Sequence, residues 1–153
     1  MRSLSLKEIA EATGGRPAGE WARLSVTSVG TDTRLLRSGD LFVALRGPNH
    51  DANGFLDDAA RGGAKAAVAS SKSPLAADFH SRNPEFPLVL VKDTLEALVA
   101  LAAHVRQSLD IDAVGITGTT GKTCTKDMLV SILSRDRGVA GSKGSFNNEV
   151  GIP

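Results

Sequence analysis

The sequence predicts an α/β protein in two parts, a mixed α/β region with β-α-β units followed by the start of a second, parallel-sheet domain. Two apolar runs, 41–45 and 66–69, enclose a segment with helical spacing. Strand, helix and strand with short connections are typical of a parallel sheet. A later apolar run, 113–117, precedes a glycine-rich turn and an amphipathic segment, which indicates a second strand-to-helix unit.

The chain opens with a helix signal. Ser5 and Glu8 have the spacing of a capping box, in which each side chain binds the main chain of the other residue. Gly14 and the glycine after it are expected to end this helix, because glycine readily leaves a helix through positive φ. The alternation of apolar and polar residues over 24–29 then predicts a half-buried strand.

The middle of the chain predicts the β-α-β unit itself. The run 41–45 is expected to be a buried strand, residues 55–60 a helix ending at a glycine pair, and 66–69 a second strand. Residues 70–87 are rich in Ser, Pro, Asn and charge without a sustained period, so we expect a surface excursion. The run 88–91 predicts one more buried strand.

The last third of the chain predicts a long helix, a strand and another helix. Asp93 and Glu96 have cap spacing, and apolar residues then repeat with helical period to Leu109. A strand at 113–117, a glycine-rich turn and then a helix that carries Met128, Leu129, Ile132 and Leu133 are expected to follow. We expect a domain boundary near Lys92, which gives domains 1–92 and 93–153. One strand and one helix cannot cover both faces of a parallel sheet, so the sequence resembles the front part of a longer protein.

Composition excludes several classes of protein. The 153 residues carry 18 Lys and Arg against 17 Asp and Glu, so a nucleic-acid binder with a large basic surface is not expected. One Cys cannot form an internal disulfide, and three scattered His give no metal-ligand spacing. No apolar stretch is long enough to span a bilayer, and the N-terminus lacks the apolar core of a signal peptide. We therefore expect a cytoplasmic protein without membrane insertion.

The glycine-rich turn over 118–123 predicts a phosphate-binding loop, and so a mononucleotide-binding second domain. Its glycines let main-chain N–H groups approach phosphate oxygens at the start of a helix. Lys122 is expected to reach the β- and γ-phosphates, and the Thr123 hydroxyl to ligate Mg²⁺. The spacing departs from the common pattern, whose first glycine would fall at Ile116. The alternative is a tight turn with an exposed lysine.

Three segments of the sequence resemble the Mur ligases of peptidoglycan synthesis. Residues 117–123 resemble the family's ATP loop, and 146–153 are similar to a segment of the member that adds D-alanyl-D-alanine. Residues 31–34 and 39–47 resemble the Asp-Ser-Arg and Gly-Asp-Leu-Phe signatures. The sequence departs from the family pattern at several positions: Thr33 replaces Ser, Cys124 replaces Thr or Ser, Ser145 replaces Asn, and Asp51-Ala52-Asn53 replaces Asp-Gly-His.

This resemblance implies a role for each part of the chain. Residues 1–92 would hold the UDP part of a UDP-sugar, with Thr33 and Arg34 near its diphosphate; Arg46 and Asn49 are weaker candidates. The implied substrate-side amides are Asn147 and Asn148. Residues 93–153 would begin the ATP-binding domain, with Lys122 and Thr123 in catalytic roles and Thr123 on Mg²⁺. The implied ATP-binding residues are Gly118, Thr119, Thr120, Gly121, Lys122, Thr123 and Cys124.

The implied reaction is an ATP-dependent amide ligation. A UDP-N-acetylmuramoyl tripeptide would be joined to D-alanyl-D-alanine through an acyl phosphate, by an enzyme that we expect to be a monomer. The fragment alone is expected to be inactive. Two alternatives stay open: a ligase of the same family that adds a single amino acid at an earlier step, and a non-catalytic P-loop module that only binds nucleotide.

Overall fold

The chain divides into two compact units, residues 1–106 and 107–153. The structure, a computed structural model, describes all residues except 1–2, 22–23, 48–49 and 143–153. The division falls near the end of helix α4 (Thr94–Gln107), whose buried residues pack in the core of the first unit. The boundary expected near Lys92 therefore lies inside the first unit, because α4 belongs with the sheet that precedes it.

The first unit is built on a five-stranded, mostly parallel sheet. Four strands are parallel to one another: β4 (Ser28–Gly30), β5 (Asp40–Val43), β6 (Ala66–Ser70) and β7 (Leu88–Val91). Strand β2 (Arg16–Ala18) is antiparallel at the edge beside β7. A separate antiparallel pair joins β1 (Leu4–Ser5) to β3 (Ser25–Val26). The strand order in the large sheet is β2, β7, β6, β5 and β4.

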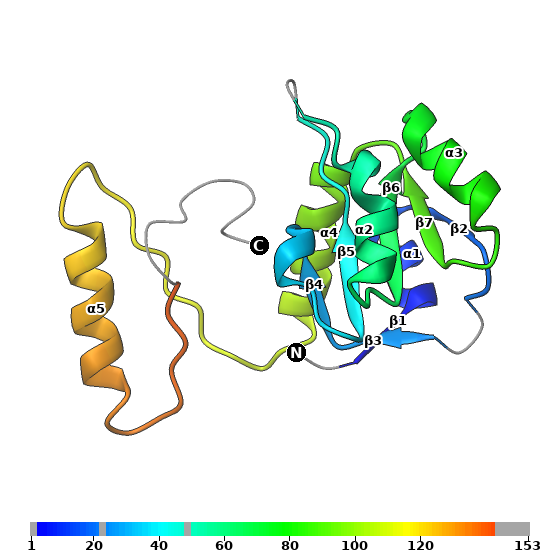
Figure 1. The fold of residues 1–153 in the computed structure, drawn as a ribbon. Coiled ribbons are helices and arrows are strands. Elements are labelled where there is room, and N and C mark those ends of the chain that lie inside the picture. Colours follow the sequence, from blue (N-terminus) through cyan, green and yellow to red (C-terminus); the bar gives the residue numbers. More distant parts are fainter. Residues whose placement is uncertain (1–2, 22–23, 48–49, 143–153) are drawn as a thin grey trace. The chain divides into compact units, whose positions relative to one another are not determined.

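Helices cover both faces of this sheet (Figure 1). Alternate residues of β5 separate into two cores, with Leu41 on one face and Phe42 on the other. Each fully buried side chain of this size contributes about 1.5–3 kcal/mol through removal of apolar surface from water. Helices α1 (Leu6–Thr13) and α4 pack on the Leu41 face, and α2 (Leu56–Arg61) and α3 (Pro74–Arg82) on the Phe42 face.

The expected start and end of the first helix are confirmed. The Ser5 hydroxyl accepts from the main-chain N–H of Glu8, and the Glu8 carboxylate accepts from the N–H of Ser5. Gly14 follows the helix with φ of 61°. The strand expected over 24–29 divides instead, since Ser25–Val26 joins β1 whereas Ser28–Gly30 joins the large sheet.

The surface excursion expected over 70–87 was wrong, because this segment contains helix α3. Ser73 stands at the N-cap position and Pro74 occupies the first turn, where its missing N–H costs no hydrogen bond. Ala76 and Phe79 are its buried residues. Their spacing gives only one apolar repeat, which is too short to stand out against the polar residues around it.

The second unit contains helix α5 (Lys122–Leu133) as expected. The strand expected at 113–117 was wrong: in the described part of this unit, 107–142, no residue is in a strand. A strand is stable only when its main-chain groups pair with a neighbour, and the described residues of this unit supply none. The apolar side chains of Val114, Met128 and Ile132 are correspondingly exposed.

Candidate functional site

The carboxyl ends of the parallel strands gather polar side chains at one edge of the sheet. Ser28 pairs with Asp40 and Gly30 with Phe42, so β4 and β5 end side by side. Ligands of open α/β sheets usually bind beyond this edge. Two loops begin at this edge. The loop after β4 carries Arg34, and the loop after β5 carries Arg46.

The loop after β4 is organised by Asp32. Its carboxylate caps the short 3-10 helix η1 (Thr33–Leu35) by accepting from the N–H of Arg34 at 3.0 Å. It also accepts from Nε of Arg34 at 2.9 Å and from Nη2 at 2.6 Å, so the two planar groups meet through two parallel bonds. The side-chain and main-chain hydrogen bonds from Arg34 lower the pKa of Asp32 to about 2.

The loop after β5 is closed at its base. Residues Arg46 and Asp51 form an antiparallel bridge, and the N–H of Ala52 donates to the carbonyl of Leu45 at 3.0 Å. The Asp51 carboxylate then caps the second 3-10 helix, η2 (Ala52–Phe55), by accepting from the N–H of Asn53 at 3.0 Å. Nε of Arg46 lies 3.8 Å from the Asp51 carboxylate.

A buried polar network fixes this turn to the neighbouring strand ends. The Asp51 carboxylate also accepts from Nδ2 of Asn53 and, at 2.8 Å, from the hydroxyl of Ser73 beyond β6. The side-chain oxygen of Asn53 accepts from the N–H of Ser70 at 3.0 Å, and the Thr94 hydroxyl beyond β7 accepts from the N–H of Arg46 at 3.1 Å. Three strand ends are therefore linked through side chains.

The electrostatics of Asp51 favour its charged form. Burial acts to raise the pKa of the Asp51 carboxyl group. The hydrogen bonds from Asn53 and Ser73, with the nearby Arg46 guanidinium, outweigh burial and lower the pKa. Asp51 therefore stays ionised at neutral pH beside Arg46.

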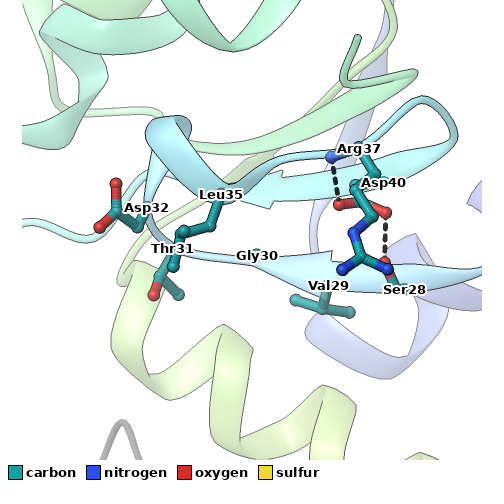
Figure 2. A pocket seen from close by; sticks show the side chains of 8 residues that line it. All are labelled: Ser28, Val29, Gly30, Thr31, Asp32, Leu35, Arg37 and Asp40. Carbon is teal, nitrogen blue, oxygen red and sulfur yellow. Dashed lines mark hydrogen bonds between the residues drawn. The ribbon is translucent and has the colours of Figure 1, made fainter. Parts of the chain in front are cut away.

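A shallow hollow of about 340 Å³ runs along β4. Figure 2 shows Thr31 and Asp32 at one end and Ser28, Arg37 and Asp40 at the other. The buried Asp40 carboxylate accepts from the Ser28 hydroxyl and from the N–H of Arg37. Its lining residues are Ser28, Val29, Gly30, Thr31, Asp32, Leu35, Arg37 and Asp40, so it borders the expected Thr33–Arg34 pair without including it.

The expected phosphate loop of the second unit ends at the N-terminus of α5. Gly118 and Gly121 have φ of 149° and 78°, in the region that residues with a Cβ rarely adopt. Nζ of Lys122 donates to the carbonyl of Gly118 across the loop. Thr119, Thr120, Thr123 and Cys124 are exposed around it. The loop therefore has the glycine geometry and helix start that phosphate binding requires.

Some expected site residues are not brought together by the described structure. Asn49, Asn147 and Asn148 lie outside the described residues. Ser73 and Thr94, which hold the turn after β5, were not among the expected site residues. Thr94 stands at the start of the expected long helix, and Asp51-Ala52-Asn53 is marked in the sequence only by its departure from the Mur ligase pattern. Tertiary hydrogen bonds of this kind have no signal in a single sequence.

Curated proteins align with the whole length of the chain, whereas no family model matches it. It is 39% identical over 153 residues to the UDP-N-acetylmuramoyl-tripeptide–D-alanyl-D-alanine ligase of Escherichia coli, and 35% identical over 150 residues to that of Bacillus subtilis. These alignments take in 100% and 97% of the chain, but only 31% and 32% of the relatives.

Solved structures agree with the sequence matches. A crystal structure of MurF from Acinetobacter baumannii matches 99% of the chain with a TM-score of 0.84 and 30% identity, over 32% of its own length. MurF from Thermotoga maritima, solved in complex with ADP, matches 83% of the chain with a TM-score of 0.68 and 31% identity, over 28% of its length.

The fold and these matches show that the chain is a homologue of the Mur ligases. Within that family it is homologous to MurF, and it spans about a third of the length of the curated MurF relatives that it matches. Among the described residues, no helix is long and apolar enough to cross a membrane.

Proposed function

We propose that this chain is the part of a MurF ligase that holds the UDP portion of the tripeptide substrate and begins the ATP site. The observation that carries the proposal is the coincidence of a whole-chain match to MurF with a glycine loop of suitable geometry at the start of α5. MurF from Thermotoga maritima was solved with ADP, which supports nucleotide binding in the family.

We place the UDP portion at the carboxyl edge of the first sheet, beyond β4 and β5. At the carboxyl end of β4, the hollow offers the Thr31 hydroxyl beside main-chain groups of an edge strand. Thr33 and Arg34 lie at its border, and Arg46 emerges from the next strand end. Hydroxyl donors and guanidinium groups are the side chains that suit a ribose and a diphosphate.

We place ATP at the loop 118–123. The N–H groups at the start of α5 would bind phosphate oxygens, and Nζ of Lys122 would exchange the Gly118 carbonyl for the β- and γ-phosphates. The exposed Thr123 hydroxyl in the first turn suits one oxygen ligand of Mg²⁺, which would neutralise phosphate charge when bound. Among the described residues, no group of three or more His, Cys, Asp and Glu side chains could hold a metal ion. Thr123 is the Mg²⁺ ligand that we propose.

In the proposed reaction, an oxygen of the tripeptide's terminal carboxylate attacks the γ-phosphorus of ATP. ADP leaves and an acyl phosphate forms. The amine of D-alanyl-D-alanine then attacks the acyl carbon, phosphate leaves, the amine loses a proton, and an amide bond results. Lys122 lowers the repulsion between the two anions of the first step by its positive charge.

Two titrations of the whole chain test this proposal. We expect UDP-N-acetylmuramoyl tripeptide to bind without ATP, and a fluorescent ATP analogue to bind in a way that Lys122→Ala abolishes. Lys72→Ala, at an exposed position in the other unit, is the matched control and should leave analogue binding unchanged. The absence of UDP-sugar binding at millimolar ligand would refute the first half, and analogue binding insensitive to Lys122→Ala would refute the second.

A further inference from the structure

Two arginines lie in the loops that follow two neighbouring parallel strands, β4 and β5. Gly30 of β4 pairs with Phe42 of β5, and each is followed four positions later by an arginine, Arg34 and Arg46. Neighbouring strands lie about 4.8 Å apart. Each loop also contains an aspartate that caps a 3-10 helix and pairs with its arginine, Asp32 with Arg34 and Asp51 with Arg46.

The two pairs differ in how many guanidinium N–H groups the aspartate leaves free to bind an anion. Both oxygens of Asp32 bind Arg34, through Nε at 2.9 Å and Nη2 at 2.6 Å. An incoming phosphate would have to compete with that carboxylate for the Nε–Nη2 edge of the guanidinium. While the pair persists, Arg34 therefore offers an anion only its Nη1–Nη2 edge.

Arg46 is held in a different way. Nε of Arg46 lies 3.8 Å from the Asp51 carboxylate, beyond hydrogen-bond distance, and Asp51 already accepts from Asn53 and Ser73. Among the described residues, Asp51 is the one ionic partner of Arg46. The side chain of Arg46 is 49% exposed, so its guanidinium N–H groups are accessible from solvent.

The position of Arg46 is nevertheless well defined at the main chain. Its N–H donates to the buried Thr94 hydroxyl, and the bridge to Asp51 closes the turn that it begins. Asp51 is itself fixed to Asn53, which is 1% exposed, and to Ser73, which is 2% exposed. Arg46 therefore has a main chain held by hydrogen bonds and a neighbouring carboxylate that is itself held in place. Such an arginine loses less conformational entropy on binding an anion than one on an unrestrained loop.

We propose that Arg46, and not Arg34, provides the side-chain cation for the diphosphate at this strand edge, and that Asp51 is the positioning residue that directs it. This inference rests on the proposed function, since the diphosphate is that of the UDP portion. It also reverses the ranking expected from the sequence, in which Arg34 came first and Arg46 was a weaker candidate.

The first test compares UDP with uridine, which lacks the phosphates. Both would be titrated into the whole chain and its variants by calorimetry. Arg46→Ala should weaken UDP binding about tenfold and leave uridine binding unchanged, because one charge-assisted hydrogen bond is lost. Arg34→Ala should change UDP binding less than twofold. Arg61→Ala is the matched control, an exposed arginine at the end of α2 that also pairs with an aspartate.

The second test asks whether Asp51 acts through Arg46. Asp51→Asn keeps an acceptor for Asn53 and a polar group for Ser73 but removes the charge that faces Arg46. It should weaken UDP binding about threefold in the wild-type chain and have no further effect in the Arg46→Ala background. Ser73→Ala, which loses a hydrogen bond to Asp51 without removing the charge, should lower stability without changing the ratio of UDP to uridine affinity.

The outcomes separate this inference from the proposed function. If wild-type chain binds neither UDP nor UDP-N-acetylmuramoyl tripeptide, the proposed function fails. If UDP binds and Arg34→Ala weakens it more than Arg46→Ala, the assignment of Arg46 is wrong. Equal losses for UDP and uridine, or additive effects of Asp51→Asn and Arg46→Ala, would show a purely structural role and overturn the inference.

Discussion

The side-chain oxygen of Asn53 accepts a hydrogen bond from the main-chain N–H of Ser70 over 3.0 Å, and both residues are almost completely buried. This contact joins the 3-10 helix after β5 to the last residue of β6. A main-chain N–H that is buried without an acceptor costs free energy. Loss of this hydrogen bond would leave the N–H of Ser70 in that state, and this cost exceeds the net stability that the bond itself contributes. The geometry of the strand edge depends on it.

Asn53→Ala should therefore lower the free energy of unfolding by about 1–3 kcal/mol, because the N–H of Ser70 loses its acceptor inside the protein. Urea unfolding followed by circular dichroism measures this. Ser81→Ala is the control: its hydroxyl donates to a helix carbonyl at an exposed site, and its removal should change stability by less than about 0.5 kcal/mol. Equal effects of the two substitutions would contradict the buried role of Asn53.

Ser5→Ala should cost about 1 kcal/mol of unfolding free energy, because the first turn of α1 loses the acceptor for the N–H of Glu8. The returning bond from the N–H of Ser5 to the Glu8 carboxylate uses main chain and would persist in part. Ser3→Ala, at an exposed position before the helix, should be neutral. Thermal unfolding of the two variants, compared side by side, tests whether the capping box stabilises this unit.

Stability should fall as the pH is lowered from about 4 to about 2. The Asp32 and Asp51 carboxyl groups both have a lowered pKa in the folded chain, whereas an unfolded Asp has a pKa near 3.9. In that window the unfolded chain binds more protons, so stability contributed by these carboxylates is complete above pH about 4 and is lost as the pH falls through their folded pKa.

Asp51→Asn should make this acid loss shallower, since one of the groups with a lowered pKa is removed. Urea midpoints measured from pH 5 to pH 2 give the slope. Asp110→Asn, at an exposed position in the second unit, removes the same charge elsewhere and should keep the wild-type slope. An unchanged slope for Asp51→Asn would show that Asp51 is not held in its charged form by Asn53 and Ser73.

The elements that could be predicted are those whose signals are local. The capping box at Ser5 and the apolar runs of β5 and β7 carry their own evidence, because a cap or a buried strand needs only a few adjacent residues. Helix α3 could not be distinguished, since its burial rests on Ala76 and Phe79 alone. The run 113–117 has the sequence of a strand, but strand formation also depends on a neighbouring strand.

The candidate site divides in the same way. The glycine loop before Lys122 is contiguous, so its residues predict a phosphate site directly. The contacts of Arg46 could not be predicted, because the Thr94 hydroxyl that accepts from its main-chain N–H lies 48 positions away in the sequence. Nor could the sequence rank Arg34 against Arg46, because the ranking depends on which donors Asp32 and Asp51 already bind.

Gly15→Ala should destabilise the first unit by about 1–3 kcal/mol, because a methyl group there would overlap the sheet. A Cβ at Gly15 would overlap Cγ1 of Val89 and lie 2.9 Å from Cγ1 of Val91, and both valines are buried in β7. Gly54→Ala is the control, since its Cβ would lie 3.6 Å from Cδ1 of Leu75, an ordinary contact. Adding Val89→Ala to Gly15→Ala should relieve the overlap, so that urea unfolding shows a smaller loss for the double variant than the sum of the two single losses. An additive double variant would mean that the overlap with Val89 is not what destabilises Gly15→Ala.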